Sequence, residues 1–370
     1  MSARSIRIEA GPRRGCVTSP RSKSHEHRLL IASFLAGDLT RLSPAEGDSD
    51  DILATKRCLV ELSKEGDTPV LDCGESGSTR RFLSPVASAL GKRPVFKTAG
   101  RLAERPQLDY SILESGLFTL EGAVSSQFVT GLLFALPILQ GDSFVRFSSR
   151  LESRGYVDMT IRVLAEAGVK VFEKSDGFEV PGSQRYKKLS RYSVEGDWSG
   201  AAFWFAMNSL GGDVKVLGLD EESAQPDKAV CRLLKKISQA HASSSVVIDV
   251  SECPDLFPVL AVVAAAQCGE VVFSGIRRLR YKESNRVSAM ADVLKNLGVA
   301  TREEEEAFAV CGKGELFRSC EISTFSDHRI AMAAAVASSY ASGEIVLDDA
   351  MCAAKSYPAF FDEFFKLQRI

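Results

Sequence analysis

The sequence predicts an α/β protein of two domains, in which buried helices lie inside and sheets lie around them. Its 370 residues are too many for one ordinary hydrophobic core. Six stretches along the chain share one pattern: a polar or basic start, an apolar helix, a glycine beside a charge, and a short β-rich run. Six similar stretches divide naturally into two lobes of three.

The helices of the six stretches are apolar on every side and rich in Ala, Val and Ser, which is typical of buried helices. The glycine that follows each helix suits a C-cap before the next strand begins. The expected helix and strand pairs are 27–38 with 39–43, 79–92 with 93–98, 126–142 with 143–148, 200–213 with 214–218, 256–270 with 271–275, and 328–344 with 345–349.

Helices with one polar face are predicted between these stretches. They begin near Tyr156, Pro226 and Ser284, and each has the i, i+3, i+4 spacing of a surface helix. The acidic run from Glu303 to Glu306 predicts a solvated turn.

Composition indicates a soluble globular protein with reduced thiols. Hydrophobic residues make up 45% and charged residues 25%, and the net charge of −2 excludes a wholly basic nucleic-acid binder. The nine cysteines are scattered without a CxxC pair, which argues against a disulfide framework and a zinc cage. We find no apolar run of membrane-spanning length and no signal-peptide pattern, so a cytoplasmic enzyme is expected.

The stretch PRSKSHEHR, residues 20–28, predicts a polar turn that leads into a helix. Free backbone amides and the positive end of the helix dipole favour an anion there, and Lys23 and Arg28 strengthen the site. The alternative is an ordinary helix cap with two solvated basic side chains.

Two further loops of the first half carry similar chemistry. The glycine-rich turn CGESGSTRR, residues 73–81, allows close approach to an anion but matches neither GxxxxGK[ST] nor GxGxxG. In RLAERP, residues 101–106, Arg105 precedes a proline and is expected to present its guanidinium to a carboxylate or phosphate. A plain helix cap and a solvated basic turn remain the alternatives.

Polar residues also open the next helices. Ser125, Ser126 and Gln127 precede an otherwise apolar helix, and Ser153 and Tyr156 lie in another polar turn of this kind.

The second half supplies acids as well as cations. Asp255 stands before an apolar helix and is a candidate general base, although N-capping is the commoner role. Lys282 and Arg286, spaced four apart, are expected on one helical face around Glu283. Asp327 and Arg329 open the last buried helix, and Lys355 follows the last strand. Because like charges repel, the cations of both halves together indicate a shared anionic ligand.

Nearly the whole chain resembles the 3-phosphoshikimate 1-carboxyvinyltransferases, which are enolpyruvyl transferases also called EPSP synthases. The resemblance rests on stretches in the order of that family, from SKSHEHR through GESGSTRRFL, RLAERP, SSQFVTGLLFALP, SRGYVDMTIRVL, YSVEGDWSGAAFW, CPDLFPVLAVVAA, LRYKESNRVSAMADVLKNLGV and SDHRIAMAAAVA to AKSYPAFFDEF.

The resemblance implies a two-domain inside-out α/β barrel, each domain built from three βαβαββ-like units with parallel buried helices. It implies a discontinuous phosphoenolpyruvate-side domain of residues 1–18 and 200–370, and a shikimate-3-phosphate-side domain of residues 19–199. A monomer without cofactor or metal is expected, with no nucleic-acid or membrane partner.

The implied reaction transfers the enolpyruvyl group of phosphoenolpyruvate to the 5-hydroxyl of shikimate 3-phosphate and releases phosphate. The resemblance assigns catalysis to Asp255, Glu283 and Lys23. It assigns shikimate 3-phosphate binding to Lys23, Ser24, Arg28, Ser125, Ser126, Gln127, Ser153, Tyr156, Asp255 and Lys282. It assigns phosphoenolpyruvate binding to Lys23, Gly77, Arg105, Gln127, Arg286, Arg329 and Lys355. This chain departs from the usual family residues at Glu26, His27, Glu75, Ser78, Arg278 and Asn285.

Two other functions share part of this pattern. The sister transferase for UDP-N-acetylglucosamine shares the architecture, but it usually has a reactive cysteine in the loop that reads RLAERP here. A nucleic-acid-processing or polyanion-binding protein would call for a basic stripe or an aromatic platform, whereas most aromatic residues here are Phe within apolar helices.

Overall fold

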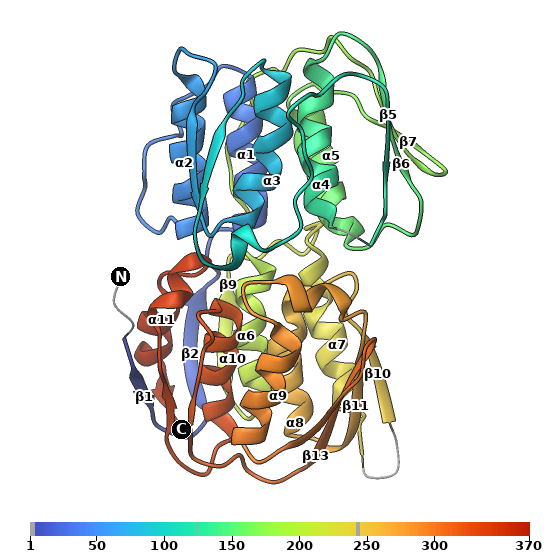
Figure 1. The fold of residues 1–370 in the computed structure, drawn as a ribbon. Helices are drawn as coiled ribbons and strands as arrows, with labels where there is room; N and C mark the ends of the chain where they lie inside the picture. The colour runs from blue at the N-terminus through green and yellow to red at the C-terminus, as the bar shows by residue number, and fades with distance from the viewer. Residues whose placement is uncertain (1–3, 124, 242–244) are drawn as a thin grey trace. The chain divides into compact units, whose positions relative to one another are not determined.

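The computed structural model describes residues 4–123, 125–241 and 245–370. The chain divides into two compact units (Figure 1). Unit 1 comprises Met1–Pro20 and Gly196–Ile370, and unit 2 comprises Arg21–Glu195. The chain therefore starts in unit 1, passes through unit 2 and returns.

Unit 2 is built from helices and two open sheets. Its helices are α1 (Lys23–Leu35), α2 (Asp50–Ser63), α3 (Gly77–Ala89), α4 (Ser126–Ala135) and α5 (Arg154–Glu166), with short 3-10 turns η1 (Gly100–Ala103) and η2 (Leu136–Ile138). Its strands are β3 (Val70–Gly74), β4 (Val95–Thr98), β5 (Leu117–Leu120), β6 (Ser143–Phe147), β7 (Phe172–Lys174) and β8 (Gly177–Val180). Strands β3 and β4 pair in parallel, and the second sheet has the order β5-β6-β8-β7.

The helices of unit 2 pack around one core. Each helix contacts the next in chain order, and α5 also packs against α1. Leu132, Leu133 and Phe134 of α4 are fully buried in this core. The prediction that the helix from Ser126 is apolar and buried is therefore confirmed.

Glycine at position 131 allows α4 to lie very close to α3. A Cβ atom at Gly131 would lie 2.4 Å from the backbone oxygen of Arg81, which is far inside van der Waals contact. This close approach brings the first turns of α3 and α4 together, and both carry candidate site residues.

Unit 1 has three open sheets around its helices. The helices are α6 (Trp198–Ser209), α7 (Val230–Ile237), α8 (Phe257–Ala265), α9 (Arg286–Asn296), α10 (His328–Ala337) and α11 (Phe360–Lys366), with 3-10 turns η3 (Pro226–Ala229), η4 (Pro254–Leu256), η5 (Arg277–Tyr281), η6 (Ser338–Tyr340) and η7 (Met351–Lys355). The strands are β1 (Ile6–Ile8), β2 (Arg13–Thr18), β9 (Asp213–Leu217), β10 (Ser245–Asp249), β11 (Cys268–Ser274), β12 (Ala300–Glu303), β13 (Ala307–Lys313), β14 (Cys320–Ile322), β15 (Ile345–Leu347) and β16 (Gln368–Arg369). The strand orders are β1-β15-β14, β10-β11-β13-β12 and β16-β2-β9.

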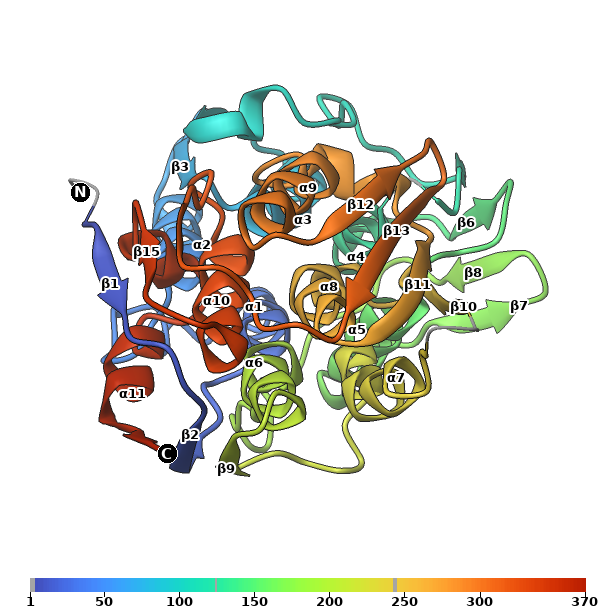
Figure 2. The same ribbon diagram turned by 90° about the horizontal axis from the view of Figure 1, so that it is seen from below.

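Helices α6, α8 and α10 form the centre of unit 1. They contact one another, and the strands lie outside them (Figure 2). Every residue of α8 and α10 is buried, which confirms the prediction from their apolar sequences. Helices α5, α7 and α9 show the predicted mixture of buried and exposed positions.

One predicted strand is wrong. Residues 39–43 form turns instead, because the Asp38 carboxylate accepts hydrogen bonds from the backbone and side chain of Thr40. A local side-chain bond of this kind replaces a strand partner. The expected α/β class is confirmed, while the described strands form five separate sheets, none of which closes on itself.

Among the described residues, no helix combines the length and the apolar character that crossing a bilayer requires.

Candidate active site

A cluster of charged side chains lies in unit 1 where η4 and the segments that start α9 and α10 meet. We call it the acid–base cluster, and it consists of Asp255, Lys282, Glu283, Arg286, Asp327 and Arg329. Three of these side chains are cationic and three are acidic. Buried ionic groups are stable only when they are paired with groups of opposite charge.

Arg286 is the centre of this cluster. Its side chain is only 1% exposed, and its Nε donates to Oδ2 of Asp327 at 2.9 Å. Its Nη1 donates to Oδ1 of Asp255 at 2.7 Å, and its Nη2 donates to Oε2 of Glu283 at 2.8 Å. One guanidinium therefore fixes three carboxylates from separate segments of the chain.

Asp255 faces two further cations. Lys282 Nζ lies 3.2 Å from Asp255 Oδ1, and Arg329 Nη2 lies 3.6 Å from Oδ2. Arg329 is itself held by a hydrogen bond of 3.0 Å from Nη1 to the backbone oxygen of Ser199. About a quarter of the Asp255 side chain (26%) is exposed, so this carboxylate can reach a bound molecule.

The surroundings set the charge states of the two aspartates. Burial by itself raises the pKa of Asp255, but Lys282, Arg329 and Arg286 outweigh it, so the pKa lies well below its usual value. Burial likewise opposes ionisation of Asp327, and the neighbouring Arg286 holds its pKa below the usual value. Both aspartates are therefore ionised at neutral pH.

The prediction that Lys282 and Arg286 share a helical face is wrong. Asn285 caps α9, which begins only at Arg286, and Lys282 lies in extended backbone after η5. The two cations are nevertheless brought together, because both contact the same oxygen of Asp255. Lys355 is 5% exposed at the end of η7, which packs against α10.

In unit 2, Lys23 occupies the first position of α1. The N-cap of this helix is Ser22, so the helix begins four residues before the predicted start at 27 and includes most of the stretch predicted as a turn. Lys23 Nζ lies 2.8 Å from Oδ2 of Asp51, which is buried in the first turn of α2.

Arg28 lies one turn further along α1 and is 3% exposed. Its Nε donates to Thr160 Oγ1 at 2.9 Å, and its Nη2 donates to the backbone oxygen of Tyr156 at 2.7 Å and to Thr130 Oγ1 at 3.4 Å. Nη1 donates to the backbone oxygen of Ser24. Arg28 therefore ties α1 to α4 and α5, and these bonds use four of its five N–H donors.

Two buried guanidiniums meet at Gly77. A Cβ atom at this position would lie 3.1 Å from Nη1 of both Arg81 and Arg105, so a larger residue would require both guanidiniums to shift. Arg81 Nη1 donates to Gln127 Oε1 at 2.7 Å, and Gln127 Nε2 donates to Ser78 Oγ at 2.9 Å. We call Gly77, Arg81, Arg105 and Gln127 the arginine pair site.

The remaining candidates lie at the starts of α4 and α5. Ser125 is the N-cap of α4 and accepts from the Gln127 backbone amide, and Ser126 is buried. Ser153 is the N-cap of α5 and is buried in the left-handed conformation, with φ of 54°. Tyr156 follows in the first turn, and its carbonyl holds Arg28.

Sequence reasoning missed three residues of these sites. Arg81 is four positions after Gly77, so helical spacing could have placed it on the face of Gly77. Asp51 stands in the acidic start of α2, where it resembles an ordinary cap. The pairing of Asp327 with Arg286 cannot be seen in any local sequence pattern, because 41 residues separate the two.

Glu75 and His27 are two further positions that depart from the usual family residues. Glu75 packs its side chain over Gly100, at the start of η1. His27 is buried, with Nδ1 2.8 Å from Thr55 Oγ1, and burial lowers the pKa of its ring to about 3.

Glu26 is a third departure, and it is nearly inaccessible at 2% exposure. It pairs with Arg21, whose side chain is 41% exposed. Burial raises the pKa of Glu26 to about 7, although Arg21 opposes the shift. The folded chain therefore holds this proton more tightly than the unfolded chain does.

We predict that Glu26→Gln stabilises the protein at alkaline pH. The unfolded carboxyl loses its proton near its ordinary pKa, whereas the folded one keeps it until about pH 7. Wild-type stability must therefore fall as pH rises between these values, and glutamine removes the loss. The gain in unfolding free energy should be about 2 kcal/mol larger at about pH 8 than at about pH 5, measured by urea unfolding.

The control for this experiment is Glu61→Gln, an exposed i, i+3 partner of Lys64, which should change stability by less than about 0.5 kcal/mol at both pH values. A Glu26→Gln gain that is the same at both pH values, or a loss at alkaline pH, contradicts the prediction.

In the described part of the chain, no three His, Cys, Asp or Glu residues are arranged to hold a metal ion.

Comparison with known proteins identifies close relatives. The family model described as EPSP synthase (3-phosphoshikimate 1-carboxyvinyltransferase) matches residues 107–364. A curated 3-phosphoshikimate 1-carboxyvinyltransferase of Clostridium kluyveri is 37% identical over 95% of this chain and 94% of its own length. The enzyme of the same name from Clostridioides difficile is 35% identical over 97% of this chain and 96% of its own length.

Solved structures share the fold. An EPSP synthase of Acinetobacter baumannii superposes with a TM-score of 0.74 at 22% identity, covering 99% of this chain and 98% of that one. An enolpyruvyl transferase of Streptomyces tendae gives a TM-score of 0.66 at 14% identity, covering 100% and 98%. At such identities the likeness concerns the fold alone.

Proposed function

The chain belongs to the EPSP synthase (3-phosphoshikimate 1-carboxyvinyltransferase) family, and we propose that it transfers the enolpyruvyl group of phosphoenolpyruvate to the 5-hydroxyl of shikimate 3-phosphate. Phosphate is the second product, and the reaction is a step of the shikimate pathway towards chorismate and the aromatic amino acids. The observation that carries the proposal is the acid–base cluster, where cations hold Asp255 and Glu283 beside each other.

We propose a division of labour between the two units. Unit 2 binds shikimate 3-phosphate through Lys23, Ser24, Arg28, Ser125, Ser126, Gln127, Ser153 and Tyr156. Unit 1 contributes Asp255 and Lys282 to that substrate, and Arg286, Arg329 and Lys355 to phosphoenolpyruvate. Lys23, Gly77, Arg105 and Gln127 of unit 2 complete the phosphoenolpyruvate ligands.

Both substrates are anions, and the arginine pair site suits a carboxylate or phosphate. Arg81 and Arg105 lie against the same glycine, so the N–H donors of two guanidiniums are close enough to bind one small anion. Arg81 donates hydrogen bonds to Gln127 and to the backbone oxygen of Pro106, and these bonds fix the orientation of its guanidinium. We therefore assign Arg81 to positioning and Arg105 to direct contact with phosphoenolpyruvate.

The first chemical step is addition. The 5-hydroxyl oxygen bonds to carbon 2 of phosphoenolpyruvate, Asp255 accepts the hydroxyl proton, and Glu283 in its acid form delivers a proton to carbon 3. In the protein alone Asp255 is a weak base, because Lys282, Arg329 and Arg286 hold its pKa well below the usual value. Substrate anions compete for these cations, and that competition raises the basicity of Asp255.

The second step is elimination. In the tetrahedral adduct the bond from carbon 2 to the phosphate oxygen breaks, and the departing phosphate takes the proton that Asp255 accepted. Carbon 3 returns a proton to Glu283, and the electron pair of that C–H bond forms the double bond again. Arg286 contacts both Asp255 and Glu283, and it therefore holds the two proton-carrying groups in fixed positions through both steps.

We also propose the finer fold and the cellular setting. The buried helices α8 and α10 support the inside-out arrangement of three βαβαββ-like units in each domain. All nine cysteines are free thiols, which supports a reducing, cytoplasmic location. A monomer is proposed because the reaction assigns every catalytic role to one chain.

The function is tested by phosphate release from phosphoenolpyruvate. We expect release with shikimate 3-phosphate, together with a product that contains the enolpyruvyl ether, and no release with UDP-N-acetylglucosamine. Turnover of the UDP-sugar instead, or of neither acceptor, would overturn the proposed function.

Within the same assay, Arg105→Lys should lower kcat/KM for phosphoenolpyruvate by about 100-fold, because lysine cannot replace a bidentate guanidinium. The matched control is Arg101→Lys in the same loop, where Arg101 pairs with Glu104 at 3.5 Å and both side chains are exposed. This control should stay within about twofold of wild type. Equal losses in both variants would show that the loop matters in general and that Arg105 has no specific role.

A further inference from the structure

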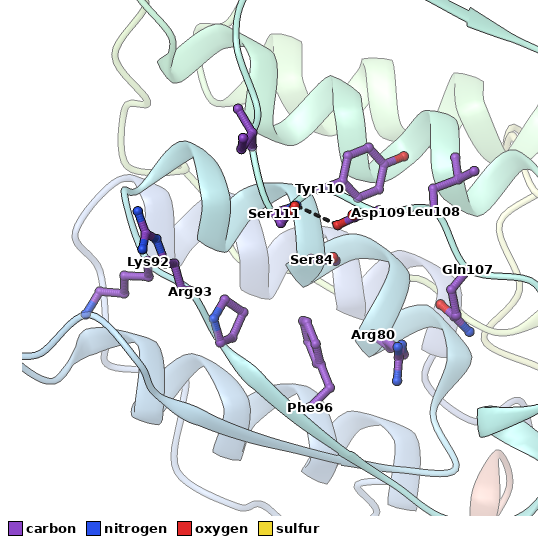
Figure 3. Close-up of a pocket in the computed structure, with 12 residues that line it drawn as sticks. Arg80, Ser84, Lys92, Arg93, Phe96, Gln107, Leu108, Asp109, Tyr110 and Ser111 are labelled. Atoms are coloured by element: carbon purple, nitrogen blue, oxygen red, sulfur yellow. Dashed lines mark hydrogen bonds between the residues drawn. The ribbon is translucent and has the colours of Figure 1, made fainter.

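A pocket lies in unit 2, and it shares no residue with the acid–base cluster or the proposed substrate ligands. Its volume is about 730 Å³, which is within the range of small-molecule sites. One side is formed by residues 92–94 and Phe96 around the start of β4, and the other by residues 107–112, with Arg80 and Ser84 of α3 between them (Figure 3).

Three cations line this pocket: Arg80, Lys92 and Arg93. None of them forms an ion pair within residues 4–123, 125–241 and 245–370. Lys92 Nζ donates to the backbone oxygens of Lys64 and Gly66, at 2.7 and 3.0 Å, so its charge is fixed in place without a carboxylate. The pocket thus holds positive charge that the protein does not neutralise.

One acid also lines the pocket. Asp109 accepts a hydrogen bond of 2.8 Å from the backbone amide of Ser111, and Figure 3 shows this bond within the turn of the opposite wall. The carboxylate of Asp109 therefore stabilises the turn to which it belongs. Because three cations and one acid line the pocket, its net charge is positive.

The same pocket exposes apolar surface. Ile112 is 80% exposed and Leu108 is 37% exposed, although Tyr110 and Leu113 of the same segment are buried in the core of unit 2. The two buried residues anchor this wall, so the exposure of the other two does not come from a detached loop. Large exposed apolar side chains beside a concave site indicate a ligand with an apolar body.

Arg80 combines the two kinds of surface. Its guanidinium carbon lies 5.2 Å from the centre of the Phe96 ring. A guanidinium stacked on an aromatic ring keeps its N–H edge open for a planar carboxylate. Arg80 and Phe96 therefore present a bidentate donor next to an apolar wall.

We propose that this pocket binds a small aryl carboxylate, with the carboxylate on Arg80 or Arg93 and the ring between Phe96 and the side chains of Leu108 and Ile112. Charge selects the anion, and the apolar wall selects the ring. Neither feature alone suffices, since a bare anion leaves the apolar wall exposed and a neutral aromatic leaves the cations unpaired.

The experiment is isothermal titration calorimetry of the full chain with 3-phenylpropionate. We expect saturable binding at one site. The matched neutral compound, 3-phenylpropan-1-ol, and the bare anion acetate should each bind at least about tenfold more weakly, since each lacks one of the two groups that the pocket recognises.

Variants locate the binding. Phe96→Ala should weaken 3-phenylpropionate at least about tenfold, and so should at least one of Arg80→Gln and Arg93→Gln, of which Arg93 is the exposed position. The matched control is Arg146→Gln, because Arg146 lies over Phe144 at 5.6 Å elsewhere in unit 2. The Arg146→Gln variant should bind 3-phenylpropionate with the affinity of the wild type.

The proposal is overturned by an absence of saturable binding, by equal binding of the alcohol, or by wild-type affinity in both Arg80→Gln and Arg93→Gln. It is also overturned if Arg105→Lys alone abolishes binding, because the carboxylate then occupies the proposed phosphoenolpyruvate site.

Discussion

A buried guanidinium with three carboxylate partners is the constraint on which the proposed chemistry depends. Arg286 is almost inaccessible, and a buried charge of this kind is tolerated only when its partners are held in place. Asp255, Glu283 and Asp327 come from three segments, so the packing of α8, α9 and α10 has to bring these segments to one point. Apolar helices that are buried on every side provide the rigid support for that meeting.

The two units handle positive charge differently. In unit 1 the side chains of Asp255, Glu283 and Asp327 contact the cations directly, which suits groups that move protons. At the arginine pair site of unit 2, the neutral oxygens of Gln127 and Pro106 accept hydrogen bonds from Arg81 and orient its guanidinium. The contrast supports assigning proton transfer to unit 1 and most of the anion binding to unit 2.

Local sequence patterns predicted the buried helices well, because an all-apolar helix leaves few alternatives. They failed where a single side chain decides the backbone: Asp38 turns residues 39–43 away from a strand, and the Asn285 cap starts α9 after Lys282. Asp327 and Arg286 could not be paired from the sequence, since only the fold brings them together. The family motifs supplied the residue types, and the fold supplied the partners.

The central claim is that the cations around Asp255 keep it ionised in the protein alone, so that it can accept a hydroxyl proton once substrate anions compete for those cations. The most direct test is a carbon-13 NMR titration of the Asp255 carboxyl carbon, assigned by its absence in Asp255→Asn. The claim predicts the ionised chemical shift down to about pH 4, where an ordinary aspartate is already half protonated. A titration midpoint at or above about pH 4 would contradict it.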